Sequence, residues 1–204
     1  MPKKEKTTNR KRRNILEAAI KVFARRGFFQ STISQIALEA GVANGTIYLY
    51  FKNKEDILVQ IFNFKTSQVF KKFQEEVEKA DNSIDKLKNF VRRHLEEFQR
   101  DRDMAIVYQA ETHRQSRLSE SHIKKMSEMY LNIVTEIVEQ GQQEDAIRRD
   151  LYVSLVKRFI LGGVDEVINT WLHSKKKYDL ASMADPLVEL FIKGIGTGSS
   201  SGQI

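Results

Sequence analysis

The scarcity of proline is the feature that most constrains the fold of this chain. Its 204 residues include only two prolines, Pro2 and Pro186, so no proline ring interrupts helix formation between them. Apolar residues recur at intervals of three and four along most of this length, which is the spacing of one face of a helix. No segment alternates apolar and polar residues for long enough to indicate a strand. The sequence therefore predicts an all-α protein.

The apolar spacing predicts nine helical segments. Ser31 or Thr32 is expected to cap the second segment, and Gly41 is expected to end it. A polar loop is expected at 141–149, and the chain from residue 194 onward, rich in glycine and serine, is expected to be a disordered linker. The segments cover about 15–26, 33–40, 46–51, 54–79, 84–98, 104–111, 121–137, 151–171 and 180–191.

Positive charge is concentrated at the start of the chain. The whole sequence has a formal net charge of +7, and residues 1–58 alone hold 12 basic and five acidic side chains, which accounts for all of the excess. The remaining three-quarters of the chain is balanced. This asymmetry indicates a polyanionic partner, with nucleic acid as the first expectation and an anionic membrane surface as the second.

Composition also excludes several classes of protein. The absence of cysteine excludes disulfides, thiolate metal sites and cysteine nucleophiles. No apolar run approaches the roughly 20 residues that span a bilayer, and the polar, basic start does not resemble a secretion signal, so a cytoplasmic protein is expected. The four histidines lack metal-ligand spacing, and no phosphate loop or serine-nucleophile motif occurs. We therefore expect no enzyme, no metal and no cofactor.

Two short helical segments around a glycine form the clearest functional pattern. Gly41, followed by Val42 and Ala43, joins the second and third segments, which is the plan of a helix-turn-helix. Such a pair also occurs in ordinary helical bundles, but the positive charge on the same segment favours DNA binding. The residues of the third segment expected to lie partly outward are Asn44, Thr46, Tyr48, Leu49 and Tyr50.

This segment resembles the helix-turn-helix signature of the TetR family of bacterial repressors. The resemblance lies in residues 41–58, GVANGTIYLYFKNKEDIL, and in Ile15–Ala19 and Phe23–Phe28, which are similar to the first helix of that family. It implies a homodimer that places two recognition helices on successive major grooves of a near-palindromic operator. The implied parts are a DNA-binding domain at 1–53, a ligand-binding and dimerisation domain at 54–195, and a disordered tail at 196–204.

The resemblance also implies DNA contacts for individual residues. Asn44 is chemically able to form two hydrogen bonds with adenine. Leu49 departs from the polar or aromatic residue that is frequent in the family, and its side chain would either meet a thymine methyl group or pack inward. The implied contacts are Thr46, Tyr50 and Lys54 to phosphates; Ala43, Asn44 and Tyr48 to base edges, with Gly45 in the same surface; Thr32 to the DNA backbone; and Arg10, Lys11, Arg12 and Arg13 as a basic arm on phosphates or in the minor groove.

The neutral part of the chain is rich in aromatic residues. An ordinary core explains each of them, but helical bundles lined by Phe and Met side chains also enclose ligand cavities. Few charges lie among the apolar stripes, so a cavity here would suit a long neutral chain. Nearby basic residues form either a solvated face or a site for an anionic head group. The candidate cavity residues are Phe62, Val69, Phe73, Phe98, Val107, Tyr108, Met126, Met129, Tyr130 and Phe159, with Arg102 and Arg114 near the mouth.

Residues 46–58 and 163–167, with Trp171, resemble the FadR-type members of the TetR family, which repress fatty-acid degradation genes and release DNA on binding long-chain acyl-CoA. The resemblance implies acyl-CoA as a hydrophobic effector that shifts the fourth helical segment and loosens the operator. Alternatives are a multidrug or efflux regulator of the same family and a non-specific architectural DNA-binding protein. The implied dimer residues, in the last two helices, are Leu155, Phe159, Gly162, Gly163, Trp171, Leu187 and Phe191.

Overall fold

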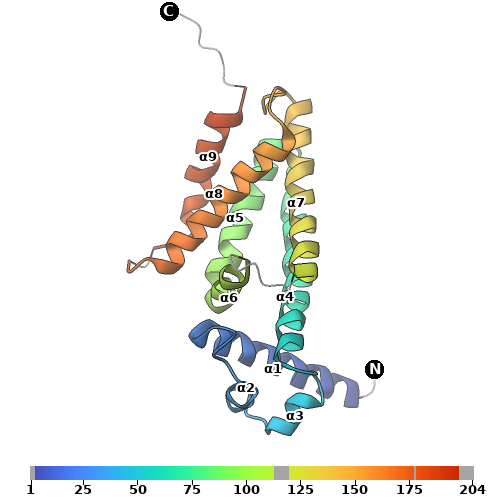
Figure 1. Ribbon diagram of the computed structural model, residues 1–204. Helices are drawn as coiled ribbons and strands as arrows, with labels where there is room; N and C mark the ends of the chain where they lie inside the picture. The colour runs from blue at the N-terminus through green and yellow to red at the C-terminus, as the bar shows by residue number, and fades with distance from the viewer. Residues whose placement is uncertain (1–2, 113–119, 177, 198–204) are drawn as a thin grey trace, which may run out of the picture. The chain divides into compact units, whose positions relative to one another are not determined.

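The structure is a computed structural model that describes residues 3–112, 120–176 and 178–197 (Figure 1). Apart from one isolated β-bridge, its regular structure is helical, which confirms the predicted all-α fold. None of the described helices is long and apolar enough to cross a membrane. The elements are α1 (Lys3–Arg26), α2 (Ile33–Ala40), α3 (Asn44–Tyr48), α4 (Lys54–Val77), α5 (Ser83–Arg100), α6 (Arg102–Thr112), α7 (Glu120–Gln143), α8 (Val153–His173), the 3-10 helix η1 (Ala181–Met183) and α9 (Ala184–Ile195).

Several helices have boundaries that differ from the expected ones. α1 begins at Lys3, three turns before the first apolar residue, because residues 3–14 contain no helix-breaking residue. α7 continues through Gly141, where the loop was predicted to begin. The glycine is needed there because an added Cβ atom would lie 2.6 Å from Cδ1 of Ile147, so the residue serves packing inside a helix and does not end it.

The expectation of a linker at the C-terminal end is wrong for residues 194–197. α9 continues to Ile195, whose side chain is buried. The backbone N–H of Arg148 donates to the Ile195 carbonyl at 2.9 Å, and the Thr197 hydroxyl donates to a carbonyl of the α7–α8 connection at 2.7 Å. These bonds hold the end of α9 against that connection. Residues 198–204 lie outside the described residues.

The chain divides into two compact units. Unit 1 consists of Met1–Ser67 and Asp101–Lys125, and unit 2 consists of Gln68–Arg100 and Met126–Ile204. α4 contributes its first half to unit 1 and its second half to unit 2, and α6 belongs to unit 1. Unit 1 is therefore larger than residues 1–53, and the functional boundary after residue 53 stays a prediction.

Unit 1 is built on α1, which packs against both α2 and α6. One face of α1 is fully buried, as its apolar spacing predicts, and it includes Ile15, Leu16 and Phe23. The rings of Phe23 and Phe28 meet edge to face with centroids 5.3 Å apart. The first half of α4 completes the core with apolar residues that are at most 1% exposed, namely Ile57, Leu58, Ile61 and Phe62.

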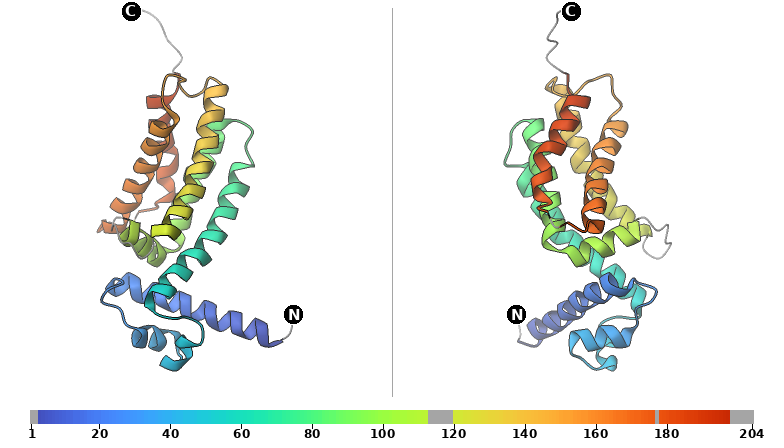
Figure 2. Two further views of the ribbon diagram at one scale, coloured as in Figure 1. Left: turned by 45° about the vertical axis from the view of Figure 1, so that its right-hand side comes forward. Right: turned by 90° about the vertical axis from the view of Figure 1, so that its left-hand side faces the viewer.

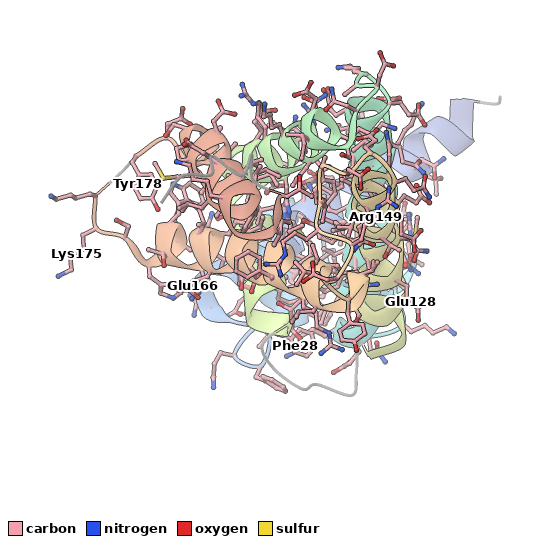
Figure 3. The ribbon with its side chains drawn as sticks, turned by 90° about the horizontal axis from the view of Figure 1, so that it is seen from above. Phe28, Glu128, Arg149, Glu166, Lys175 and Tyr178 are labelled. Atoms are coloured by element: carbon pink, nitrogen blue, oxygen red, sulfur yellow. The ribbon has the colours of Figure 1, made fainter. Side chains whose placement is uncertain are left out.

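Unit 2 is built around α5, against which α8, η1 and α9 pack. Both views of Figure 2 show α8 and α9 side by side. The close approach of these helices depends on Gly163, since an added Cβ atom would lie 2.8 Å from Cζ of Phe191. After α8, the chain turns back, and the Trp171 indole N–H donates to the Tyr178 carbonyl at 3.1 Å; Lys175 of this turn points away from the helices (Figure 3).

Candidate nucleic-acid interface and effector site

The turn between α2 and α3 has the geometry of a helix-turn-helix. Thr32 caps α2 in a capping box with Gln35, in which each side chain bonds the backbone N–H of the other. Gly41 ends the helix in the left-handed conformation, with φ 65° and ψ 37°. The Asn44 amide, at the start of α3, donates to the Ser34 hydroxyl at 2.9 Å. These local signals fix the angle at which α3 leaves α2.

The outer face of α3 is unusually apolar for an exposed surface. Ile47 is the buried residue of α3. Tyr48 and Leu49, in contrast, are among the exposed large hydrophobic residues of the described chain. Leu49 is 80% exposed, which decides between the two orientations that its sequence position allowed: it faces outward. Asn44 and Gly45 are also exposed, and Thr46 and Tyr50 are half-buried, so each residue that was expected to lie outward is at least partly accessible.

The basic arm is part of α1 and is helical. Arg10 and Lys11 are exposed. Arg12 is held within unit 1, because its guanidinium donates to the Gln60 side chain at 2.5 Å and lies 5.9 Å from the centroid of the Phe51 ring. Arg10 and Lys11 are therefore the members of the predicted arm that are available to DNA without breaking an internal contact.

Lys54, predicted to contact a phosphate, instead holds the α1–α2 turn to the start of α4. Its ammonium group donates to the carbonyls of Phe28 and Ser31, both at 2.8 Å, and to that of Phe29 at 3.3 Å. It also lies 4.6 Å from the centroid of the Phe28 ring. All three N–H donors of the ammonium group are thus directed at backbone carbonyls of unit 1.

Lys65 joins three elements of unit 1 through one half-buried ammonium group. Its side chain is 16% exposed, and Nζ lies 3.0 Å from Glu17 Oε1 on α1 and 2.8 Å from Asp101 Oδ2. The other carboxylate oxygen of Asp101 accepts the backbone N–H of Met104 and so caps α6. This triad ties α1, α4 and the start of α6 together.

An aromatic cluster in unit 2 surrounds a buried histidine. The ring of His94, on α5, lies with its centroid 4.8 Å from that of Phe98, 4.9 Å from that of Tyr130 and 5.6 Å from that of Phe73. Nδ1 of His94 is hydrogen-bonded to the Tyr130 hydroxyl. Burial lowers the pKa of His94 to about 3, so the imidazole is neutral at physiological pH.

The predicted cavity residues are divided between the two units, and the cavity stays a prediction. Val69, Phe73, Phe98 and Tyr130 belong to the apolar core of unit 2 or pack against it. Phe62 and Val107 are buried in unit 1, where Tyr108 and Arg102 also lie, half-buried and exposed respectively. Met129 is in unit 2 and 42% exposed. The side chains of Met126 and Arg114 lie outside the described residues.

Phe159 does not join the aromatic cluster around His94. Its ring meets Phe191 at 5.3 Å between centroids and stays 50% exposed. It lies on the outer face of α8 because the inward positions of that helix are taken by Val156, Ile160 and Val164. Its two predicted roles, in a ligand cavity and in a dimer interface, both stay predictions.

The outer face of α8 carries a row of exposed apolar side chains. Tyr152, Leu155 and Phe159 are spaced by three and four residues, and Gly162 continues the row with open space around it. Leu190 of α9 is also exposed, and sequence reasoning missed it together with Tyr152. The other predicted dimer residues face inward to differing degrees: Gly163, Trp171 and Leu187 are half-buried, and Phe191 is buried.

His94 is the main residue of this site that sequence reasoning did not select. Within the described residues no group of three or more metal-binding side chains occurs. The available signal was its spacing, since Phe90, His94 and Phe98 follow one another at intervals of four on the buried face of α5. A polar residue in the middle of an apolar stripe is a departure from pattern that indicates a specific role.

Two family descriptions match consecutive parts of the sequence and together cover residues 15–194. Residues 15–61 match the family described as bacterial regulatory proteins, tetR family, and residues 62–194 match the family described as YsiA-like protein, C-terminal region. The fatty acid metabolism regulator protein of Bacillus subtilis is 40% identical over 182 residues, covering 89% of this chain and 93% of that protein. The HTH-type transcriptional repressor KstR2 of Mycobacterium tuberculosis strain H37Rv is 28% identical over 74% of this chain and 76% of that protein.

Two solved structures share the fold over most of the chain. One is the transcriptional regulator FadR from Bacillus subtilis in complex with stearoyl-CoA, with a TM-score of 0.83 and 37% identity over 89% of this chain and 98% of that chain. The other is the fatty acid degradation regulator FadR from Bacillus halodurans, with a TM-score of 0.81 and 34% identity over the same shares of the two chains.

Proposed function

The chain belongs to the TetR family of bacterial regulatory proteins, and we propose that it represses fatty-acid degradation genes and leaves its operator when long-chain acyl-CoA binds. It is a DNA-binding regulator and not an enzyme. The observation that carries the choice of effector is the similarity to a FadR solved with stearoyl-CoA, which extends over nearly the whole of both chains. The cytoplasm, where a bacterial chromosome lies, is its proposed location.

The DNA surface is proposed to consist of the exposed face of α3 and the start of α1. Asn44, Tyr48 and Leu49 would face the base edges in the major groove, and Leu49 suits a thymine methyl group. Arg10 and Lys11 would contact phosphates. An α-helix is about 10–12 Å wide and the minor groove about 6 Å, so an arm that is helical binds along the backbone and does not enter that groove.

Lys54 has a different role in this proposal from the one first expected. Because its ammonium group is directed at three carbonyls, it would hold the helix-turn-helix to α4 and act on DNA only through that position. Displacing α4 would then displace α3. The Lys65 triad would act in the same way on α1, which makes α4 the element through which effector binding reaches the DNA surface.

A homodimer is proposed to form through the exposed row on α8 and through Leu190 of α9. An unpaired apolar row of this kind is typical of a protein–protein interface, and a two-fold axis would bring the same row of a second copy against it. Leu155→Glu tests this in sedimentation velocity, where we expect a dimer for the wild type and a monomer for the variant. Leu38→Glu is the matched control, since Leu38 is exposed but lies on α2. An unchanged dimer in Leu155→Glu would contradict the proposed interface.

The effector is tested on a duplex selected from random DNA by the purified protein. Fluorescence anisotropy then gives the affinity for that duplex alone and with saturating stearoyl-CoA, stearate, CoA or a lipophilic cation. We expect stearoyl-CoA to weaken binding at least tenfold and the other three to have little effect. Unchanged affinity with stearoyl-CoA would refute the proposed effector, and release by the cation would favour a drug-responsive regulator. Competition by random DNA at equal strength would indicate a non-specific architectural protein.

A further inference from the structure

The side chain of Asn44 is bonded across the helix-turn-helix and not to its own helix. An asparagine at the start of a helix commonly accepts a backbone N–H of the first turn and so caps the helix. Here the N-cap of α3 is Ala43, and no side-chain hydrogen bond caps that end. The amide nitrogen of Asn44 instead donates to the hydroxyl of Ser34, in the first turn of α2, at 2.9 Å. The bond therefore joins α3 to α2, two helices that adjoin in Figure 1.

The bond between Asn44 and Ser34 orients a side chain and contributes little to stability. Both residues are exposed, so water replaces either partner if the other is removed. Breaking the bond therefore leaves no buried polar atom unsatisfied. The terminal torsion of an asparagine has no sharply preferred angle, so its amide turns readily unless another group holds it. In this chain Ser34 holds it.

The orientation of the amide decides which hydrogen-bonding groups Asn44 offers to a ligand. A side-chain amide has one carbonyl oxygen, which accepts, and two N–H groups, which donate. In the part of the chain that the structure describes, Ser34 is the only hydrogen-bond partner of the Asn44 side chain. The carbonyl oxygen Oδ1 and one N–H therefore stay available. An acceptor beside a donor is the complement of the major-groove edge of adenine, where the N6 amino group lies beside the N7 acceptor.

We propose that Ser34 is a positioning residue for base recognition: it accepts the Asn44 N–H that points away from Oδ1, so that Oδ1 and the other N–H lie side by side for adenine. Guanine has two acceptors, O6 and N7, on the same edge. An amide held by Ser34 places its carbonyl oxygen opposite O6, where two acceptors repel, whereas an amide that turns freely directs its N–H groups at guanine. The bond to Ser34 thus raises the preference for adenine over guanine. This inference rests on the proposed DNA surface and deepens it.

The test measures base preference at the operator position that Asn44 reads. Among duplexes selected from random DNA by the full chain, this is the adenine whose replacement by guanine no longer changes the affinity of Asn44→Ala. Fluorescence anisotropy gives the ratio of the affinities for adenine and guanine at that position. We expect a ratio of about ten or more in the wild type, the effect of one bidentate contact. In Ser34→Ala the ratio should fall about three- to fivefold, the effect of one exposed hydrogen bond.

Two further measurements separate positioning from other roles of Ser34. Ser34→Thr keeps a hydroxyl and should keep the ratio. A duplex with 7-deazaadenine lacks only the N7 acceptor, so it removes the bond that the second Asn44 N–H donates to the base. This analogue should weaken binding most in the wild type, less in Ser34→Ala and not at all in Asn44→Ala.

A matched control on the same helix excludes a general effect of α2. Leu38→Ala changes another exposed side chain of α2 and should leave the ratio unchanged. An unchanged ratio in Ser34→Ala overturns this inference. A loss of affinity that is equal for every duplex also overturns it, since Ser34 would then contact the DNA backbone. In both cases the wild type still binds its selected duplex and the proposed function stands. If the wild type selects no duplex, the proposed function and this inference fail together.

Discussion

The buried imidazole of His94 makes the stability of the protein depend on pH in a way that a single substitution removes. The pKa of His94 is about 3 in the folded chain, against 6.5 for an ordinary histidine. The unfolded chain therefore takes up a proton near pH 6.5 and the folded chain does not. Well above pH 6.5, proton binding by His94 makes no contribution to the free energy of unfolding. As the pH falls from 6.5 toward 3, proton uptake by the unfolded chain lowers that free energy.

The size of this loss follows from the two pKa values. Each pH unit below 6.5 removes up to about 1.4 kcal/mol from the free energy of unfolding. Between pH 7 and pH 5 the loss from this group is about 2 kcal/mol per chain. His94→Gln keeps a side chain that can bond the Tyr130 hydroxyl but does not titrate, so the free-energy difference between wild type and variant should shrink by that amount over the interval.

Urea unfolding of both proteins at pH 7 and pH 5, at one fixed chain concentration, measures the difference. His173→Gln is the matched control, because His173 is an exposed histidine in the last turn of α8. A wild-type minus His94→Gln difference that is the same at both pH values would refute the reasoning, since it would mean that the folded chain binds the proton as readily as the unfolded one.

Three further predictions concern the DNA surface, the contacts of Lys54 and the packing of α8 against α9. Leu49→Ala should weaken operator binding about fivefold by removing an apolar contact of about 1 kcal/mol, whereas Leu38→Ala should have little effect although Leu38 is equally exposed; fluorescence anisotropy measures both. Lys54→Met should lower the free energy of unfolding by about 2 kcal/mol because three backbone carbonyls lose a charged donor, as urea titration would show. Gly163→Ala should lower that free energy by about 1–2 kcal/mol, because its Cβ atom meets the Phe191 ring, and calorimetry would detect the lower Tm.

Matched variants test the reasons given for the stability losses in Lys54→Met and Gly163→Ala. Lys52 is exposed and close to Lys54 in sequence, so Lys52→Met should leave stability nearly unchanged. Equal effects of the two lysine substitutions would argue against the carbonyl contacts. The smaller side chain of Phe191→Leu should restore part of the loss in Gly163→Ala, and a loss that does not depend on residue 191 would contradict the packing argument.

Sequence alone predicts the helix-turn-helix well because its signals are local. The cap at Thr32 and the left-handed Gly41 lie within ten residues of each other, and each acts on its neighbours in the chain. The role of Lys54 could not be predicted in the same way. Its three carbonyl partners lie 23 to 26 residues away, so the contact depends on how α4 packs against the α1–α2 turn.

The residues of the predicted ligand cavity are harder to predict, because an apolar stripe on a helix does not indicate which element packs against it. The apolar residues of α8 include some that face inward and some that face outward, and spacing alone allows Phe159 either position. Its ring contact with Phe191 and its 50% exposure place it on the outer face. Phe62 and Phe73 are both buried aromatic residues of α4, yet they belong to different units. Helical periodicity places a residue on a face but does not tell which neighbour that face meets.

The position of α6 in unit 1 affects how this regulator could be re-engineered. Asp101 caps α6 and also pairs with Lys65, while Lys65 pairs with Glu17 of α1. A chimera that exchanges operator specificity by grafting only residues 1–53 would separate Glu17 from its own Lys65 and leave a half-buried carboxylate without its lysine. The transplantable module is discontinuous in sequence: it needs residues 101–112 from the same parent as the helix-turn-helix and the first half of α4.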